Sequence, residues 1–150
     1  MSKLNTYKDD FFILLESGFI AVNQADEDSA VKLFKAAEKL DPKNELPIIG
    51  LGYLHFHKLE LRQACEIFEK VLKKNPENEM AKTFLGICLT MSPNAVQEGE
   101  DLLEEMHNSS DDLIKGLSHT AIDFVEKFIK KDPTPVEVQK KKKTKKKNKS

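Results

Sequence analysis

The side chains that could support metal or thiol chemistry are few and poorly placed in this sequence of 150 residues. His55 and His57 are two positions apart, and side chains at that spacing on a helix point about 200° away from each other, so they cannot share a metal ion. Cys65 and Cys88 are the two cysteines, and neither belongs to a CxxC pair. HExxH motifs and glycine-rich phosphate loops are absent as well. We therefore expect no enzyme activity, no metal and no cofactor, and two reduced core thiols as in cytosolic proteins.

Adjacent carboxylates are the other candidates for acid–base chemistry. Glu104–Glu105 and Asp111–Asp112 fit solvated helix surface and helix capping better than a catalytic pair. His107 and His119 belong to no metal or catalytic motif, and the GLG at 50–52 falls inside a helical pattern, where glycine serves packing. The function of this chain is therefore expected to lie in its surfaces.

The charge of the chain is unevenly distributed. Residues 132–150 contain eight lysines and two acidic residues, a net charge of +6, and the overall charge of −1 leaves −7 for the other 131 residues. This lysine-rich composition predicts disorder. The stretch would either bind nucleic acid or anionic lipid through salt-dependent electrostatics, or act as a solubilising extension that contacts the acidic body or a partner. It has no interleaved aromatic residues for base stacking, which favours the second interpretation.

Neither a membrane span nor a signal peptide is predicted. The sequence has no run of about 18 apolar residues. Its N-terminal stretch, MSKLNTYKDDFF, lacks the apolar core and the small-residue cleavage site of a signal peptide. Together with the cysteine usage, these features predict a cytoplasmic protein.

A 34-residue period runs through the sequence. The stretch EKLDPKNELPIIGLG at 38–52 recurs in similar form as LKKNPENEMAKTFLG at 72–86. Identical residues 34 positions apart are Gly18, Gly52 and Gly86, Ala30 and Ala64, Phe34 and Phe68, and Pro42 and Pro76. This period resembles that of tetratricopeptide repeats, whose helix–turn–helix units stack into a right-handed solenoid. The resemblance implies an all-α fold with repeats at about 11–44, 45–78 and 79–110.

The repeated residues suit a helical hairpin. Glycine and alanine are small enough to let the two helices of a unit cross about 8–10 Å apart, and Phe34 and Phe68 supply the large apolar side chain of the second helix. Pro42 and Pro76 end that helix, because the residue before a proline is driven out of the α region. An asparagine two residues after each proline can cap the next helix. The repeated stretch is therefore interpreted as the joint between two similar units.

The third unit departs from this spacing. We expect one inserted residue in the turn MSPNA, which places Gly99 at the helix crossing and Leu103 at the aromatic position. The periodicity and the helix-end signals then predict helices at about 7–23, 27–40, 45–57, 61–74, 79–91, 95–107 and 111–131, with no strand.

The helix expected at 111–131 would cap the solenoid, so that residues 1–131 form one domain and residues 132–150 a disordered basic tail. Asp111 or Ser110 can cap this helix, and lysines gather in its last turn. A solenoid needs such an element to cover the apolar face of its last repeat. The stripe expected to do so consists of Leu113, Leu117, Ala121, Phe124, Val125 and Phe128.

The resemblance to tetratricopeptide repeats also implies a partner-binding groove, lined by the first helix of each unit. The residues at the groove positions are mainly apolar, with aromatic rings and two methionines among them. They are Phe12, Leu15, Phe19, Leu46, Ile49, Tyr53, Phe56, Met80, Phe84, Ile87 and Met91. A continuous apolar patch of this kind predicts a site for an apolar helix or an extended peptide, unless some of these residues pack between helices or another segment covers them.

The tetratricopeptide proteins that bind the acidic C-termini of heat-shock chaperones hold the carboxylates with lysine, asparagine and arginine side chains. None of the residues at the matching positions here fits such a clamp. These residues are Leu15, Phe19, Gly50, Met80 and Phe84. The groove is therefore expected to bind apolar side chains and not a C-terminal carboxylate.

The small acidic body, the three repeats and the apolar groove together resemble the tetratricopeptide chaperones of bacterial type III secretion, over about residues 7–131. This resemblance implies a non-catalytic chaperone that buries an apolar segment of a secreted needle or translocator subunit, with a co-chaperone as a further partner and no small-molecule substrate. The alternative is a general tetratricopeptide adaptor or assembly factor whose lysine-rich tail contacts nucleic acid or anionic membrane.

Overall fold

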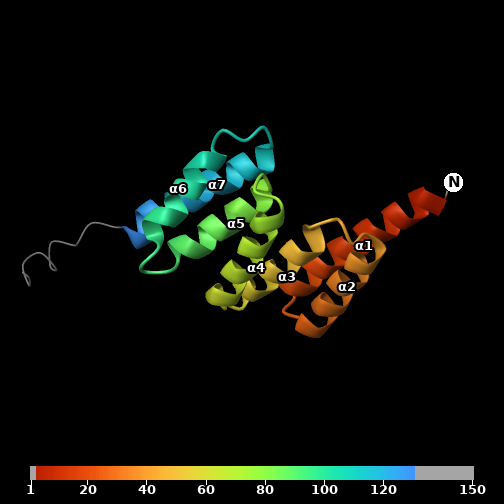
Figure 1. Cartoon of the computed structure of the whole chain (residues 1–150). Coiled ribbons are helices and arrows are strands. Elements are labelled where there is room, and N and C mark those ends of the chain that lie inside the picture. The colour runs from red at the N-terminus through yellow and green to blue at the C-terminus, as the bar shows by residue number, and fades with distance from the viewer. Residues whose placement is uncertain (1–2, 131–150) are drawn as a thin grey trace, which may run out of the picture.

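The computed structural model describes residues 3–130, with side chains from Tyr7 onward. This part of the chain is all-α, as predicted, and contains no strand. The helices follow one another from α1 at one end of the molecule to α6 and α7 at the other (Figure 1). Their bounds are α1 (Lys3–Asn23), α2 (Glu27–Leu40), α3 (Leu46–His57), α4 (Leu61–Lys74), α5 (Glu79–Thr90), α6 (Val96–Met106) and α7 (Asp112–Phe124), which continues into the π-helical turn η1 (Val125–Ile129).

The limits of the described range bear on two predictions. The basic tail predicted at 132–150 lies outside the described residues. Between Lys3 and Lys130, none of the helices is both long enough and apolar enough to cross a membrane.

Helix ends follow the predicted signals, and α2 to α6 agree with the predicted bounds to within one residue. Asn78 caps α5, because its side chain accepts a hydrogen bond from the backbone N–H of Ala81 at 2.9 Å. Asn44 accepts the N–H of Leu46 at 3.0 Å in the equivalent joint. The helix α1 is longer than predicted and begins at Lys3.

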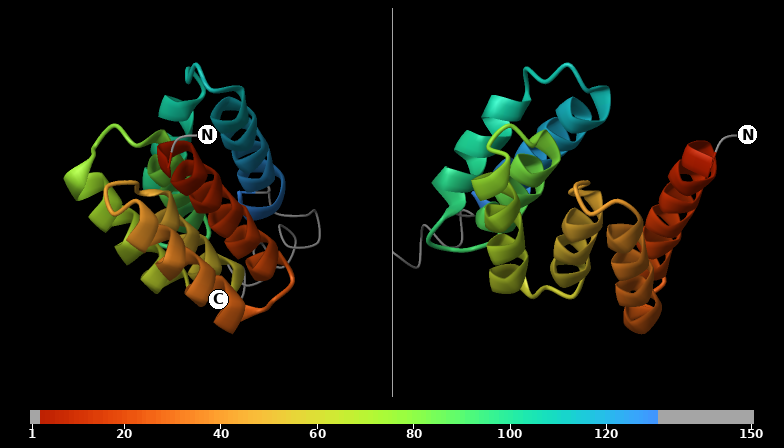
Figure 2. Two further views of the ribbon diagram at one scale, coloured as in Figure 1. Left: turned by 90° about the vertical axis from the view of Figure 1, so that its right-hand side faces the viewer. Right: turned by 45° about the vertical axis from the view of Figure 1, so that its right-hand side comes forward.

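Consecutive helices pack as hairpins, and the hairpins stack. The helix α1 packs against α2, α3 against α4, and α5 against α6. In addition, α1 contacts α3, α3 contacts α5, and α5 contacts α7. Figure 2 shows these hairpins succeeding one another from the red α1 to the green and blue helices at the far end. The first helices of the units therefore form one continuous layer, which is the layer predicted to carry the groove.

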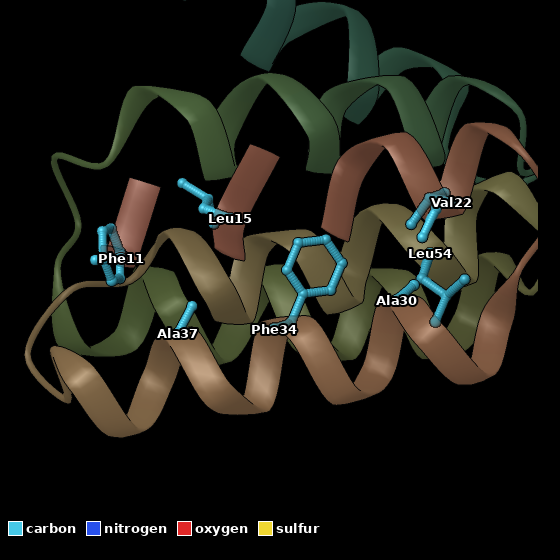
Figure 3. Packing of buried hydrophobic residues seen from close by; sticks show 8 residues of the cluster. Phe11, Leu15, Val22, Ala30, Phe34, Ala37 and Leu54 are labelled. Carbon is cyan, nitrogen blue, oxygen red and sulfur yellow. The ribbon is translucent and has the colours of Figure 1, made fainter. Parts of the chain in front are cut away.

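In the first two hairpins, the core is formed by phenylalanine rings that pack directly against glycines. Phe34 of α2 is fully buried among apolar side chains of the neighbouring helices (Figure 3). A Cβ atom added at Gly18 would lie 2.5 Å from Cε1 of Phe34, and one added at Gly50 would meet the same ring. Phe68 of α4 bears the same relation to Gly52, at 2.5 Å. These glycines are required because close packing leaves the rings no other space.

The third hairpin uses a contact between backbones. A Cβ atom added at Gly99 would lie 2.6 Å from the carbonyl oxygen of Gly86 and 2.6 Å from the backbone nitrogen of Thr90. Leu103 occupies the place of the aromatic ring, with its Cγ 2.9 Å from a Cβ atom added at Gly86. Gly99 thus lies at the crossing of α5 and α6, as the predicted one-residue insertion requires.

The turn between α5 and α6 explains why the insertion is needed. Ala25 and Leu59 occupy the equivalent turns of the first two units, and their φ angles are 58° and 61°. The next position at the 34-residue spacing is Pro93, whose ring fixes φ at about −65°. The third turn therefore cannot copy the first two. It is built from residues 91–95, whereas residues 24–26 suffice between α1 and α2.

The C-terminal helix caps the solenoid with only part of the predicted stripe, of which Val125 is buried and Leu117 and Ala121 are half-buried. It packs against α5 and α6, and the side chains that it buries in doing so include Ile114 and Ser118. The prediction was wrong for Leu113, Phe124 and Phe128, which are 65%, 50% and 65% exposed. The reason is that the helix carries two adjacent apolar stripes, and periodicity alone does not say which of them faces the core.

An ion pair between a buried carboxylate and an exposed lysine holds the end of this cap. Glu100 of α6 is 2% exposed, and its carboxylate contacts the ammonium group of Lys130, the residue that follows η1. The carboxylate of Glu126 lies 3.8 Å from the same ammonium group. The Glu100 carboxylate raises the pKa of Lys130. Because an unpaired buried carboxylate is strongly destabilising, this ion pair ties η1 to α6.

The two cysteines lie in one apolar cluster formed by α3, α4 and α5. Both are free thiols. Cys88 is fully buried, and this burial, with the neighbouring Cys65 as a smaller cause, raises its pKa to about 12. Burial raises the pKa of Cys65 as well. Since the thiolate is the reactive form, neither residue has the environment of a catalytic cysteine.

The raised pKa of Cys88 predicts a loss of stability at alkaline pH. The unfolded thiol titrates near 9.0, whereas the folded thiol keeps its proton up to about pH 12, so the unfolded state binds fewer protons between these values. The free energy of unfolding should therefore be highest below about pH 9 and should fall above it by up to about 1.4 kcal/mol per pH unit. Urea unfolding at several pH values between about 8 and 10 measures this slope. The variant Cys88→Val is the control, and equal slopes for the two proteins would contradict the prediction.

Candidate partner-binding surface

A row of aromatic rings crosses the layer formed by the first helices of the three repeats. Phe19 lies on α1, Tyr53 on α3 and Phe84 on α5. The ring centroids of Phe19 and Tyr53 are 5.5 Å apart, and those of Tyr53 and Phe84 are 5.6 Å apart. All three side chains are half-buried, so each ring also meets the surface. We call these three residues the aromatic row.

The aromatic row is held in place by the core beneath it. Phe19 packs edge-on against Phe34, with ring centroids 5.1 Å apart, and Phe84 stacks on Phe68 at 5.6 Å. The hydroxyl of Tyr53 donates a hydrogen bond to Oδ1 of Asn23 at 2.9 Å. Fixed rings lose little conformational freedom when a partner binds, so this surface is preorganised for apolar contacts.

The remaining residues predicted to line the groove fall into three groups. Phe12 is 43% exposed near the N-terminal end of the molecule. Leu15 and Ile49 are only 6% and 1% exposed, because they belong to the apolar clusters around Phe34 and Phe68, so they support the surface from below and offer no area to a partner. The half-buried residues beside the aromatic row are Leu46, Phe56, Met80, Ile87 and Met91.

One hollow in the described part of the chain lies at the N-terminal end of the layer. Its volume is about 440 Å³, and α1 forms one of its walls. Phe12 is the one residue of the predicted groove set that lines it. The aromatic row therefore belongs to a different region of the layer from this hollow.

A network of charged side chains joins the first two repeats at their turns, and the sequence analysis missed it. The ammonium group of Lys58 lies 2.7 Å from Glu27 and 3.0 Å from Glu60, and Nδ1 of His55 lies 2.5 Å from Glu60. The hydrogen bond with His55 lowers the pKa of Glu60, and the one with Glu27 raises the pKa of Lys58. No signal in the sequence points to this network, because its residues do not recur at the 34-residue period.

Two of the four histidines, His107 and His119, pack ring on ring. His107 and His119 stack face to face, with ring centroids 3.8 Å apart and ring planes 11° apart. Because the nitrogen lone pairs lie in the ring planes, two stacked rings do not direct them at one metal ion. Over residues 3–130, no group of three or more histidine, cysteine, aspartate or glutamate side chains could hold a metal ion.

Comparison with known proteins adds one relative. No family model matches the chain. The human protein "Tetratricopeptide repeat protein 6" is 35% identical over 66 residues, a match that covers 44% of this chain. Together with the stacked hairpins, this match supports a protein of the tetratricopeptide type. Such repeats generally serve protein–protein interaction through extended surfaces and are typically non-catalytic.

The tetratricopeptide match has a limited extent. It spans 13% of the length of the human protein. The similarity therefore concerns a segment of 66 residues and not the whole human protein.

Proposed function

We propose that this tetratricopeptide-type chain is a non-catalytic adaptor that binds an apolar helix or segment of another protein on its layer of first helices. The aromatic row is the observation that carries the proposal. Three half-buried rings, each packed against the next, extend across three repeats. Aromatic residues supply much of the binding energy of protein interfaces, because they bury a large area at a low cost in conformational entropy.

The proposed client is a protein that would otherwise self-associate through the bound segment, and the proposed setting is the cytoplasm. The resemblance to type III secretion chaperones motivates a secreted needle or translocator subunit as this client. Burial of its apolar segment would prevent premature assembly. Burial of apolar area on both sides should give a negative heat-capacity change on binding.

Co-purification from the native cell with the tagged full-length chain, followed by mass spectrometry, tests this proposal. Tyr53→Glu should reduce the recovered client by roughly tenfold or more, because it places a charge in the middle of the aromatic row. Ile20→Glu is a matched control on α1, at a side chain that is 55% exposed and lies outside the predicted groove set.

Two results would contradict the proposal. Equal recovery of the client with Tyr53→Glu would show that the row is not the binding surface. A collapse of helicity in Tyr53→Glu, measured by circular dichroism, would show that the ring serves the fold and not a partner. The control should keep both the client and the helicity.

The alternative function is contact of the lysine-rich tail with nucleic acid or anionic membrane, and the eight lysines at 140–149 favour testing it. Deletion of residues 139–150 or added salt should abolish binding of this kind, because it depends on charge. Client binding on the aromatic row should survive both changes, since it depends on apolar burial. The two functions are therefore separable with one deletion.

A further inference from the structure

The hollow at the N-terminal end of the layer has the size and the lining of a ligand pocket. Its volume of about 440 Å³ falls within the usual range for such pockets, and its walls are mainly apolar. The aromatic side chains that line it are Tyr7, Phe11 and Phe12 of α1. The rings of Phe11 and Phe12 meet edge to face, with centroids 5.4 Å apart. A further aromatic ring in the hollow can make edge contacts of the same kind.

The wall that α1 contributes is specific to the first unit. The helix begins at Lys3, whereas the 34-residue spacing from α3 would place its start at Phe12. The additional turns carry Tyr7 and extend beyond α2 (Figure 1). The position of Tyr7 corresponds to Asp41 in the second unit and to Asn75 in the third, and both of these residues lie outside the helices. The hollow is therefore a feature of the first unit and not a consequence of the repeat.

The polar side chains in the hollow provide both donors and acceptors of hydrogen bonds. The carboxylate of Asp41 can accept, whereas the ammonium group of Lys8 and the amide of Asn44 can donate. Asp41 and Asn44 adjoin, because the backbone N–H of Asn44 donates to the carbonyl oxygen of Asp41 at 3.1 Å. The charges cancel, since the two segments that form the hollow, residues 7–12 and 39–44, contain three lysines and three aspartates. The lining therefore matches an uncharged ligand that both donates and accepts.

The corresponding joint of the next unit shows what Asn44 lacks. There the carboxylate of Glu45 accepts a hydrogen bond from Nδ2 of Asn78 at 2.6 Å. At the 34-residue spacing these two residues correspond to Phe11 and Asn44. Phenylalanine has no acceptor, and Oδ1 of Asn44 already accepts the N–H of Leu46 at 3.0 Å, so the Nδ2 group is the end of this side chain that a ligand can use.

The hollow lies within reach of the aromatic row. Phe12 lines the hollow, and Phe19 belongs to the row. The two residues are seven positions apart on α1, so they lie on the same side of the helix and about 10 Å apart along its axis. An extended chain covers this distance with about three residues. One short segment of a client can therefore occupy both places.

We propose that the hollow is a second subsite for the client and binds one aromatic residue in an extended part of it. The aromatic side chain packs among the three rings of α1. The peptide backbone beside it donates an N–H to the carboxylate of Asp41 and offers a carbonyl oxygen to Nδ2 of Asn44. The inference rests on the proposed function in taking a protein client as the partner, but it assigns a site that shares no residue with the aromatic row.

An NMR titration of the full chain with N-acetylphenylalaninamide tests the subsite directly. This neutral probe carries the ring, the N–H and the carbonyl group that the proposal requires. We expect saturable shifts of the backbone amide signals of residues 7–12 and 40–44, with a dissociation constant in the millimolar range for so small a ligand. Phenylethylamine and 3-phenylpropionate carry the same ring with a positive or a negative charge. They should bind roughly threefold more weakly or worse, because each lacks the amide's pair of hydrogen bonds.

The variant Tyr7→Ala removes one aromatic wall at a side chain that is 58% exposed. It should raise the dissociation constant of the probe by roughly fivefold or more and leave the melting temperature nearly unchanged. Ile13→Ala is the matched control, because this α1 side chain is 60% exposed and does not line the hollow. Tyr53→Glu should also leave the probe bound, since it changes the aromatic row and not the hollow.

The client recovered by co-purification completes the test. Tyr7→Ala should weaken its binding by roughly threefold or more, whereas Ile13→Ala should not. Three results would overturn the subsite: amide shifts that are absent or spread over the whole chain, tighter binding of phenylethylamine or 3-phenylpropionate than of the neutral probe, and a client that binds Tyr7→Ala as tightly as the unsubstituted protein. Failure of the proposed function has a different signature, namely a client that Tyr53→Glu retains.

Discussion

Replacing Phe34 with alanine should lower the free energy of unfolding by about 3–5 kcal/mol. The side chain is fully buried, and its ring lies against both Gly18 of its own unit and Gly50 of the next. Truncation therefore leaves a cavity between two repeats, and the flanking glycines have no side chains with which to fill it. Urea unfolding followed by circular dichroism measures the loss. Phe12→Ala is the control, because that side chain is 43% exposed, and its effect should stay below about 1 kcal/mol.

The contact between Phe34 and Gly50 can be isolated by a double-mutant cycle. Gly50→Ala alone should cost about 1–3 kcal/mol, because the added methyl group meets a ring that cannot move away. In the Phe34→Ala background the same methyl group enters the cavity, so its cost should vanish and the better helix propensity of alanine should give a gain of up to about 1 kcal/mol. The two substitutions should therefore be strongly non-additive. Additive effects would mean that the glycine serves the crossing of the helices and not the ring.

The fold was largely predictable from the sequence, because its strongest determinants recur. Small residues, aromatic residues and prolines each recur at a spacing of 34 positions, so three separate patterns indicate the same repeat. The helix ends were predictable for a local reason, since Asn78 and the residues before Pro42 and Pro76 act on the backbone within a few positions. Even the irregular third turn was visible in the sequence, because strict 34-residue spacing would place Glu98 where the first two units have Ala30 and Ala64.

Contacts that occur once in the chain were not predictable in this way. The ion pair between Glu100 and Lys130 joins residues of two elements and leaves no periodic trace. The buried face of α7 includes the polar Ser118, so a search for apolar periodicity did not identify it.

The candidate site was predictable in part. The family pattern names the positions on the first helices that face outward, and the three rings of the aromatic row were among them. It does not show which of these residues join the apolar clusters, where Leu15 and Ile49 are buried while Phe12 stays exposed. Of two apolar residues one turn apart, the one nearer the adjoining helix becomes core, and a periodic pattern does not distinguish the two.

The substitution Gly99→Ala should be the most destabilising replacement of a glycine in the chain. The added methyl group would lie 2.6 Å from the carbonyl oxygen of Gly86 and 2.6 Å from the backbone nitrogen of Thr90. Neither atom can rotate away, unlike the end of a side chain, so α6 must move away from α5. We expect a loss of about 3 kcal/mol or more, at the upper end of the range for overpacking.

Gly116→Ala provides the matched control for this prediction. Both glycines lie inside helices, so both substitutions carry the same favourable change of about 1 kcal/mol in helix propensity. The added methyl group at Gly116 would meet no atom of the described residues within 4 Å, so only the favourable change remains. The two variants should therefore shift the urea midpoint in opposite directions. A gain in stability for Gly99→Ala would show that the backbones of α5 and α6 are not in close contact.

A second measurement on Gly99→Ala is the position along the chain at which stability is lost. In a stacked solenoid each unit is stabilised by its neighbours, so displacement of α6 should weaken α5 and α7 most and α1 and α2 least. Displacement of α6 also separates Glu100 from Lys130, so the C-terminal end of the cap loses its ion pair with α6. Hydrogen exchange should therefore show lost protection in α5 to α7, while α1 and α2 remain close to the unsubstituted protein. Uniform loss along the chain would mean that the repeats unfold as one cooperative unit, and the effect of Gly99 would then be global and not confined to the third hairpin.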